Sequence, residues 1–540
     1  MTNNDIVQKL WNLCDVLRDD GINYSEYVTE LVLLLFIKMV HENTEAGILQ
    51  KHPLPEGCRW TDLNNKDGLV LLNDYKKVLL TLSTGKDSEG NIINDDPLIR
   101  AIYADAQTRL REPRHLKQLI EALDKIDWFS AQKDGLGDLY EGLLEKNASE
   151  TKSGAGQYFT PRPLINSMVR CLKPKPGETI QDPAAGTAGF LIAADSYIKS
   201  QTDELYDLTD KQQKFQKSKA FIGVELVPST RRLALMNCLL HGMEGDAEGV
   251  VHLGNALGLA GASLPKVDIV LTNPPFGTAK GGEASISRDD LTYKTSNKQL
   301  AFLQHIYRSL KPGGRAAVLL PDNVLFEAGV GTDIRRDLMN KCNLHTILRL
   351  PTGIFYAQGV KTNVLFFTRG TKEDPMQVEN CTKKVWIYDL RTNMSNFGKR
   401  TPFTEEHLKS FEMVYGDKPD GTSPRNEGEW SFGAEAIEIK DTEENSQVEN
   451  ALQNSRWRCF SREWIAENKG DSLDISWLKD SDSLDINSLP SPEELAGSAL
   501  DELQAAMREL ELLIGSLAQD PSQETIYIKE ISLAKEVNNA

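Results

Sequence analysis

The most constraining feature of this sequence is an apolar run that stops at two consecutive prolines. Residues 267–272 read Val-Asp-Ile-Val-Leu-Thr, and Asn273, Pro274, Pro275 and Phe276 follow directly. Most residues in the run suit a buried β-strand, whereas a proline lacks a ladder donor and has a fixed φ. The chain must therefore turn after residue 272, at the carboxyl end of a predicted strand.

The four residues of that turn offer groups that suit an aromatic amine. Open α/β sheets bind their ligands at the carboxyl ends of strands. The Asn273 amide oxygen and the Pro274 carbonyl can accept the two hydrogens of an exocyclic amino group, while the Phe276 ring stacks on the same planar system. An ordinary turn at the end of a strand would have the same sequence, so the rest of the chain has to decide between the two interpretations.

Length, charge and cysteine usage restrict the class of protein. A chain of 540 residues is long enough for about two to four domains. Its net charge of −18 does not suit a protein that holds nucleic acid unaided, so a polyanionic partner would require basic patches or a basic second subunit. The seven cysteines stand singly and form no CxxC pair, which predicts reduced thiols and no metal site.

The sequence also predicts a cytoplasmic protein without a membrane span. The first residues show neither the basic nor the apolar segment of an export signal. The longest apolar run, residues 31–37, is interrupted by Lys38 and is far too short to cross a bilayer.

Residues 1–150 are predicted to form a helical bundle. Apolar residues recur at helical spacing in several segments, namely 6–17, 24–40, 75–82, 98–109 and 113–123. Strand-like alternation is not seen there. Such a domain can serve as a structural lid or as a protein contact domain, and the sequence does not separate the two.

A loop with an aromatic pair opens the next region. Gln157, Tyr158 and Phe159 precede Thr160-Pro161-Arg162, which predicts a helix with Thr160 as N-cap and Pro161 at the first helical position. The loop can close over a ligand, and the free N–H groups of the helix can hold a carboxylate. A plain capped helix would explain Thr-Pro equally well, but it would not explain the aromatic pair.

Two predicted strands then end in acidic residues. Asp182 follows the first strand and precedes a turn of small residues, Gly186, Thr187, Ala188 and Gly189, that opens a helix. This turn is not GxGxxG, and no GK[ST] follows, which disfavours a phosphate cradle. Asp182 suits a positively charged ligand such as the ammonium and sulfonium groups of S-adenosylmethionine.

The second acidic strand end, Glu225, is expected to bind ribose hydroxyls. A carboxylate at the tip of the second strand is the usual partner of that diol. A third predicted strand, 249–253, precedes Asn255, which can bond an adenine ring. A solvated loop asparagine is the alternative for that residue.

The strands and helices that follow complete an α/β pattern. A helix is predicted at 297–310, a turn at 312–315, a strand at 316–320, a helix at 332–342, and two final strands at 345–350 and 362–368. Alternation of strands and helices, followed by a hairpin-like pair, predicts a mostly parallel sheet with an antiparallel edge strand.

Four motifs resemble, in this order, those of amino-methyltransferases. They lie at residues 157–162, 182–189, 223–225 and 273–276. With segments 137–141 and 152–156 they resemble, over nearly the whole chain, the modification subunit of type I restriction-modification enzymes. The resemblance implies a Rossmann-like, S-adenosylmethionine-dependent DNA adenine N6-methyltransferase with Asn273, Pro274, Pro275 and Phe276 as catalytic residues. It also implies a set of cofactor-binding residues: Gln157, Tyr158, Phe159, Thr160, Pro161, Arg162, Asp182, Gly186, Thr187, Ala188, Gly189, Glu225 and, with less support, Asn255. At Gly254-Asn255 this chain departs from the family pattern, because many amino-methyltransferases carry an acid there.

The last part of the sequence predicts a docking helix. From Lys372 onward no run of basic and aromatic residues suits base reading. Ser491-Pro492-Glu493-Glu494 forms a capping box, and apolar residues at spacings of three and four follow as far as residue 518. This coiled-coil-like helix can pack on its own chain or on a partner, and the resemblance points to the specificity subunit. Domains are thus expected at 1–150, 151–470 and 471–540.

The resemblance further implies partners and leaves alternatives open. It suggests DNA as substrate, two copies of this chain per specificity subunit, and a separate restriction subunit for cleavage. The alternative functions are stand-alone methylation of an RNA guanine or a protein glutamine, cytosine N4 methylation, and a catalytically silent scaffold. In cytosine N4 methyltransferases the motif that corresponds to residues 273–276 more often begins with Ser than with Asn. A scaffold would have no physical reason to retain Asn273, Asp182 and Glu225 together.

Overall fold

In the computed structural model the described residues all lie within residues 1–478. The described residues are 3–22, 26–47, 49, 52–87, 89–128, 136–150, 160–276, 286–355, 360–394, 397–398, 401–428 and 454–478. Gln157, Tyr158 and Phe159 of the predicted ligand loop, and the predicted docking helix at 491–518, lie outside this part of the chain.

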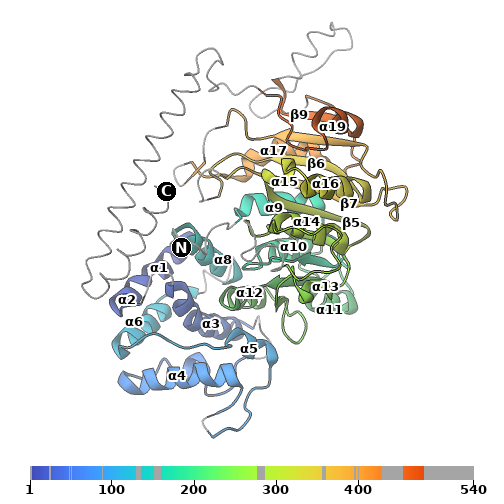
Figure 1. Ribbon diagram of the computed structural model, residues 1–540. Helices are drawn as coiled ribbons and strands as arrows, with labels where there is room; N and C mark the ends of the chain where they lie inside the picture. Colours follow the sequence, from blue (N-terminus) through green and yellow to red (C-terminus); the bar gives the residue numbers. More distant parts are fainter. Residues whose placement is uncertain are drawn as a thin grey trace, which may run out of the picture. The chain divides into compact units, whose positions relative to one another are not determined.

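The amino-terminal region is helical, as expected (Figure 1). Its helices are α1 (Asn3–Asn12), α2 (Cys14–Asp19), α3 (Tyr27–Glu45), the short 3₁₀ helix η2 (Trp60–Asp62), α4 (Gly68–Thr84), α5 (Pro97–Ile102), α6 (Pro113–Asp124) and α8 (Leu136–Glu150). The helix predicted at 98–109 ends at Ile102, where the chain leaves the helix as a turn.

Helix α3 is the centre of this bundle and explains the longest apolar run of the sequence. Residues 31–37 are all buried. Lys38, which interrupts the run, is also buried. Its charge is compensated there, because its Nζ lies 2.7 Å from Asp124 Oδ1 and 2.8 Å from Glu42 Oε1. A buried charge needs such partners. No described helix combines the length and hydropathy that a bilayer crossing requires.

A nine-stranded sheet follows, in the order β3-β2-β1-β4-β5-β7-β6-β8-β9. The strands are β1 (Ile180–Asp182), β2 (Phe221–Glu225), β3 (Val251–Leu253), β4 (Val267–Thr272), β5 (Leu310–Pro321), β6 (Cys342–Arg349), β7 (Thr362–Arg369), β8 (Lys384–Asp389) and β9 (Trp457–Ser461). The pairs β3–β2, β2–β1, β1–β4 and β4–β5 are parallel, and β7 runs antiparallel to both β5 and β6. The predicted α/β class is therefore confirmed.

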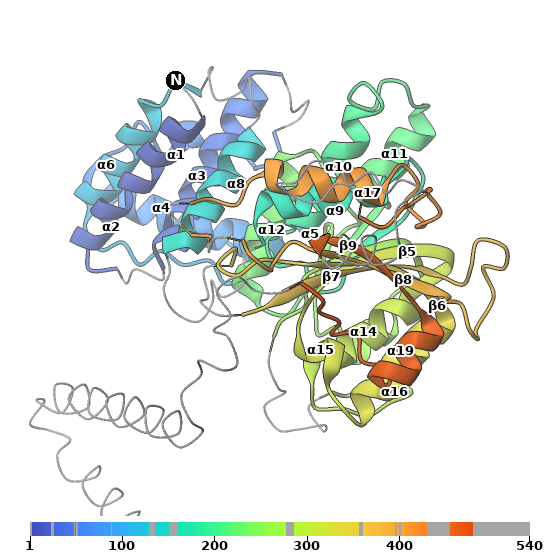
Figure 2. The ribbon, with the colours of Figure 1, turned by 90° about the horizontal axis from the view of Figure 1, so that it is seen from above.

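Helices cover both faces of the sheet (Figure 2). On one face lie α9 (Arg162–Leu172), α10 (Gly189–Ser200), α11 (Asp210–Ser218), α12 (Pro228–Leu240) and α17 (Lys409–Tyr415), which follows the 3₁₀ helix η4 (Glu405–Leu408). On the other lie α14 (Lys298–Ser309), α15 (Asn323–Phe326), α16 (Val330–Lys341) and α19 (Arg462–Lys469). The short helix α13 (Leu259–Ala262) stands between β3 and β4 in the sequence. Strand β4 contributes to both cores, with Ile269 on one side and Val270 on the other.

The second half of the sheet differs from expectation in three details. Strand β7 lies inside the sheet, and the antiparallel edge is formed by β9. Neither β8 nor β9 was predicted, because each is short and the sequence around them is charged. The turn expected at 312–315 is an irregularity within β5, where Gly313 has φ +75° and the register with β4 shifts.

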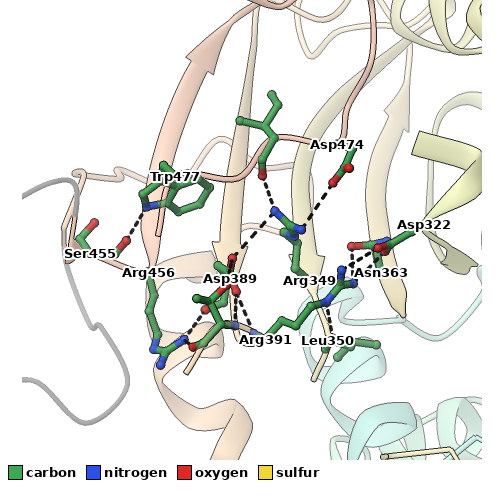
Figure 3. A network of polar contacts seen from close by, with 12 residues as sticks. Asp322, Arg349, Leu350, Asn363, Asp389, Arg391, Ser455, Arg456, Asp474 and Trp477 are labelled. Atoms are coloured by element: carbon green, nitrogen blue, oxygen red, sulfur yellow. Dashed lines mark hydrogen bonds and ion pairs between the residues drawn. The ribbon is translucent and has the colours of Figure 1, made fainter. Parts of the chain in front are cut away.

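A polar network joins the added strands to the carboxyl ends of β5 and β6 (Figure 3). The Arg391 guanidinium forms a fork on Asp322, with N–O distances of 2.7 and 2.8 Å, and its Nε donates to the Leu350 carbonyl at 2.9 Å. Arg456 Nη1 donates to the Asp389 carbonyl at 2.8 Å. Bidentate pairs of this kind hold two segments in one orientation. The network therefore holds the carboxyl ends of β5, β6 and β8 in fixed positions relative to one another.

Candidate active site

A cavity of about 390 Å³ lies at the carboxyl ends of β1 and β4. Its volume is within the range of about 300–1,000 Å³ that is common for cofactor pockets. Seven residues predicted from the sequence line it: Thr160, Arg162, Asp182, Gly186, Thr187, Gly189 and Asn273. The sheet topology thus brings together motifs that are more than a hundred residues apart in the sequence.

Asn273 is held at this cavity by a hydrogen bond to Thr160, a residue that the sequence predicted to be a helix N-cap. Its Nδ2 donates to Thr160 Oγ1 at 3.0 Å. Thr160 was predicted to cap the following helix, but α9 begins at Arg162, Pro161 is the N-cap residue, and no side chain caps the helix. The prediction was wrong because the buried Thr160 hydroxyl serves the Asn273 amide instead.

The other residues of the tetrapeptide are placed differently from Asn273. Pro274 is buried, Pro275 is exposed and Phe276 is half-buried. None of the three lines the cavity. They continue from β4 at the point where the chain leaves the sheet, as expected for consecutive prolines.

Asp182 is buried at the end of β1 and is bonded to the end of β4. Its Oδ1 accepts from Thr272 Oγ1 at 2.6 Å and from Ala184 N at 3.0 Å. Burial raises the pKa of this carboxyl from 3.8 to about 7, although the bonds from Thr272 and Ala184 lower it and nearby Glu225 raises it. A cation beside Asp182 would restore the ionised form.

The turn after Asp182 is tight and brings backbone to the cavity. Gly186 has φ +55°, and the buried Ala188 at the start of α10 has φ +69°, which costs a residue with a Cβ about 1 kcal/mol. Ala188 itself does not line the cavity. Strained backbone of this kind is concentrated at ligand sites.

Glu225 supports the turn from the neighbouring strand. Its Oε2 accepts from Gly186 N at 3.0 Å and its Oε1 from Val227 N at 2.8 Å, and burial raises the pKa of its carboxyl. It is half-buried and lies outside the lining of the cavity. Each carboxylate oxygen keeps a further lone pair with which it can accept a ribose hydroxyl.

Asn255 is exposed after β3, outside the cavity lining. Its Oδ1 accepts from Leu257 N at 2.9 Å, an Asx-type turn that shapes the chain before α13. The structure thus gives this side chain a local role in the turn before α13.

Sequence reasoning missed the wall that helix α8 contributes. Asp138, Glu141 and Glu145 line the cavity from the helical region. Glu141 Oε1 accepts from Arg162 Nη1 at 3.1 Å, and Arg162 also donates to the Gly189 carbonyl at 3.1 Å. The spacing of three and four residues, which places the three acids on one helix face, was the available signal.

Asp138 and Glu141 also lie near His241, with ligand atoms within 4.8 Å of one another. A metal ion there would have to displace Arg162 from Glu141. The seven cysteines are free, as expected.

The site therefore combines a carboxamide, a cavity rich in carboxylates, and small residues that let a ligand reach the backbone. Among the described residues that line it, four are acids and one, Arg162, is a base. Such a lining favours a cationic ligand, and the Asn273 amide at its rim can accept hydrogens from a planar amine.

Comparison with known families agrees with this geometry. The family model described as N-6 DNA Methylase matches residues 131–459, and the one described as HsdM N-terminal domain matches residues 6–123. The first match contains all the described residues that line the cavity, and the second corresponds to the helical region up to α6.

Individual relatives resemble the chain over nearly its full length. It is 58% identical to the EcoKI methylase subunit of Escherichia coli (strain K12) and 57% identical to the StySPI methylase subunit of Salmonella potsdam, in each case over 96% of both chains. The crystal structure of the EcoKI M protein matches 97% of this chain and 99% of its own, with 53% identity and a TM-score of 0.58. The chain therefore belongs to the N-6 DNA methylase family, as a methylase (M) subunit of the type I restriction enzymes and an adenine-specific DNA methyltransferase.

Proposed function

We propose that the cavity at β1 and β4 binds S-adenosylmethionine and that Asn273 presents the adenine amine to it. The observation that carries this proposal is that Asn273, Asp182 and the Gly186 turn line one cavity. When bound, the cofactor supplies an electrophilic methyl group on a sulfonium. The carboxylates of the lining suit its positive groups.

The residues present fit such a cofactor. The Asp182 carboxylate, with its pKa raised to about 7, gains most from a positive group. Glu225 keeps acceptor capacity for a ribose, and the backbone near Gly186 is open to close approach. The roles of Gln157, Tyr158, Phe159, Thr160 and Pro161 in holding the methionine end, and of Asn255 toward adenine, are part of the proposal.

Asn273 acts on the nucleophile. The N6 lone pair of adenine is delocalised into the ring, which makes the amine a poor nucleophile. If Asn273 Oδ1 and the Pro274 carbonyl accept its two hydrogens, electron density concentrates on the nitrogen, and one of these protons leaves after methyl transfer. The main contributions are then positioning and electrostatics, without a covalent enzyme intermediate.

The adenine has to leave the duplex to reach this site. Extrusion of a base costs a few kcal/mol, and stacking on an aromatic side chain such as Phe276 recovers roughly 1–3 kcal/mol. Phe276 follows the two prolines directly, is half-buried, and stands three residues after the amide that would hold the amine.

We further propose that a specificity subunit reads the DNA sequence. The net charge of −18 and the lack of a base-reading pattern in the sequence support delegation to a partner. One solved relative, with 25% identity and a TM-score of 0.65 over 97% of this chain, comes from a study of complex assembly of the type I R-M system. Two copies of this chain per specificity subunit, a restriction subunit for cleavage and a cytoplasmic location complete the proposal.

The direct test is methyl transfer from labelled S-adenosylmethionine to duplex DNA, with and without a specificity subunit. We expect label in adenine N6 of duplexes that contain the recognised site, and only when the subunit is present. Equal labelling without that subunit would contradict the division of labour. Label in cytosine would contradict the role of Asn273.

A further inference from the structure

Helix α8 forms one wall of the cavity although it precedes the first strand of the sheet in the sequence. Asp138, Glu141, Gly142, Leu144 and Glu145 all line the cavity. The helix packs between α1 of the bundle and α12 of the sheet domain (Figure 2). The bundle and the sheet thus share one binding cavity.

Contacts that need no ligand hold α8 in place. Asn237 of α12, itself buried, donates from Nδ2 to the Thr187 carbonyl at 3.0 Å and to Glu141 Oε1 at 3.4 Å. Gly137 lies so close to His241 that an added Cβ would be 2.5 Å from the ring. The wall is therefore pre-formed and tied to the turn that follows Asp182.

Glu145 stands one helical turn beyond Glu141 on the same face. Arg162 is bound to Glu141 and to the Gly189 carbonyl, and no described residue donates a hydrogen bond to Glu145. The Glu145 side chain is exposed to solvent in the cavity. Surrounding protein atoms raise the pKa of its carboxyl, Arg162 lowers it and Glu141 raises it.

The charge of this lining distinguishes a methyl donor from its product. The lining carries four carboxyl groups against one guanidinium. S-adenosylmethionine has a carboxylate, an ammonium and a sulfonium, for a net charge of +1. S-adenosylhomocysteine has lost the sulfonium charge and is neutral overall, although the two molecules differ in shape by one methyl group.

We propose that Glu145, placed by the helical bundle through α8, makes the cofactor cavity selective for the charged methyl donor over the neutral product. The proposal rests on the assignment of this cavity to S-adenosylmethionine made above. It gives the bundle a direct part in the reaction: transfer of the methyl group removes the positive charge that Glu145 attracts, and the product leaves more readily.

Calorimetric titration of the full-length protein tests the proposal. The ligands are S-adenosylmethionine, S-adenosylhomocysteine and sinefungin, which carries an ammonium in place of the sulfonium. In Glu145→Gln we expect binding of both cationic ligands to weaken about three- to tenfold, and binding of the neutral product to change less than about twofold. Added salt should lower the preference of the wild-type protein for the donor, because it screens a partly exposed charge.

Two further variants control this experiment. Glu145→Asp keeps the charge and should keep most of the preference. Glu121→Gln removes an exposed acid of the same bundle, on α6 and outside the cavity lining, and should change neither affinity. A similar effect in Glu121→Gln would show that net charge alone is responsible and would overturn the proposal.

The outcomes separate this inference from the function on which it rests. If the wild-type protein binds neither donor nor product, the assignment of the cavity fails. If it binds both, and Glu145→Gln weakens them equally or not at all, the assignment stands and the role of Glu145 is refuted.

Discussion

At the scale of single residues, the site depends on how two polar side chains are held. Asn273 is oriented by the hydroxyl of Thr160, and Asp182 is bonded to Thr272 on the same strand that carries Asn273. Both contacts join segments that are remote in the sequence. Substitutions here should therefore affect chemistry and binding separately.

Removal of the carboxamide should abolish methyl transfer and leave the cofactor cavity intact. For Asn273→Ala we expect a loss of at least about 10²- to 10³-fold in kcat, because the amine loses the acceptor that activates it. S-adenosylmethionine affinity, measured by calorimetry, should stay within about twofold. Equal loss of transfer and binding would refute the assignment of Asn273 to the target amine.

Removal of the hydroxyl that holds the amide should have a smaller effect of the same kind. In Thr160→Val the Asn273 amide loses the acceptor of its Nδ2, and we expect kcat to fall about tenfold with the KM for the cofactor nearly unchanged. Thr160→Ser restores the hydroxyl and should recover most of the rate. A rise in KM without a fall in kcat would instead indicate that Thr160 binds the cofactor directly.

Cofactor affinity should depend on pH through Asp182. The cationic ligand favours the ionised carboxylate, whose pKa is about 7 in the ligand-free protein. Affinity should therefore rise by up to about tenfold per unit as pH approaches 7 and level off above it. Calorimetry between pH 6 and 8.5 measures this, and the Asp182→Asn variant should show weak binding without that slope.

The same carboxyl should destabilise the ligand-free protein at neutral pH. Its folded-state pKa lies above the ordinary value of 3.8, so the folded protein retains a proton that the unfolded chain releases between about pH 4 and 7. Stability is thus lost as pH rises through that window. Asp182→Asn should raise the melting temperature at pH 7.5 by a few degrees and should not do so near pH 4.

At the scale of elements, Arg288 joins the irregular segment that precedes α14 to its neighbours. The Arg288 guanidinium forms a fork on Asp290, and its Nη1 donates to the Ala256 carbonyl at 2.8 Å, beside Asn255. The same nitrogen lies 2.9 Å from His305 Nδ1 on α14. Burial, with Arg288 close by, lowers the pKa of His305 to about 3, so that imidazole is neutral and accepts the bond.

Arg288→Ala should destabilise the fold by about 2–4 kcal/mol, because it leaves a buried carbonyl and an imidazole nitrogen without their donor. Urea unfolding measures the loss. Arg288→Lys cannot reproduce the planar fork and should recover only part of it. Arg308→Ala, which removes a more exposed arginine of α14, should cost less than about 1 kcal/mol. Equal losses for the Arg288 and Arg308 variants would contradict the bracing role.

At the scale of the whole molecule, the helical bundle and the sheet are joined by α8 and by α12. The bundle therefore contributes, through α8, to the cavity proposed to bind the cofactor, whereas the sequence had left it as either a lid or a contact domain. Assembly with a partner is a separate matter, which the sequence assigns to the segment after residue 490.

Deletion of residues 491–540 should separate catalysis from assembly. The truncated protein should fold and bind S-adenosylmethionine with unchanged affinity, because none of the described cavity residues is removed. It should fail to co-purify with the specificity subunit if the predicted seam docks on that partner. Retained co-purification would place the docking surface elsewhere.

The sequence alone determined the fold class, and it predicted several residues, among them Asp182 and Asn273, that line one cavity in the structure. The apolar run before Asn273, the acidic strand ends at Asp182 and Glu225, and the helical spacing of the first region all depend on local chemistry, namely the proline constraint and the periodicity of apolar residues. Strands β3, β4 and β7 and helices α14 and α16 begin and end within two residues of expectation for that reason.

Only the tertiary structure decided which of these residues meet. Three features could not be predicted from the sequence, because each brings together segments that are remote along the chain. They are the bond from Asn273 to Thr160, the place of β7 inside the sheet, and the acidic wall that α8 adds to the cavity. Chain topology brings them together, because a parallel sheet places the carboxyl ends of its strands at one edge. The packing of α8 on α12 then places the α8 residues at the cavity beside that edge.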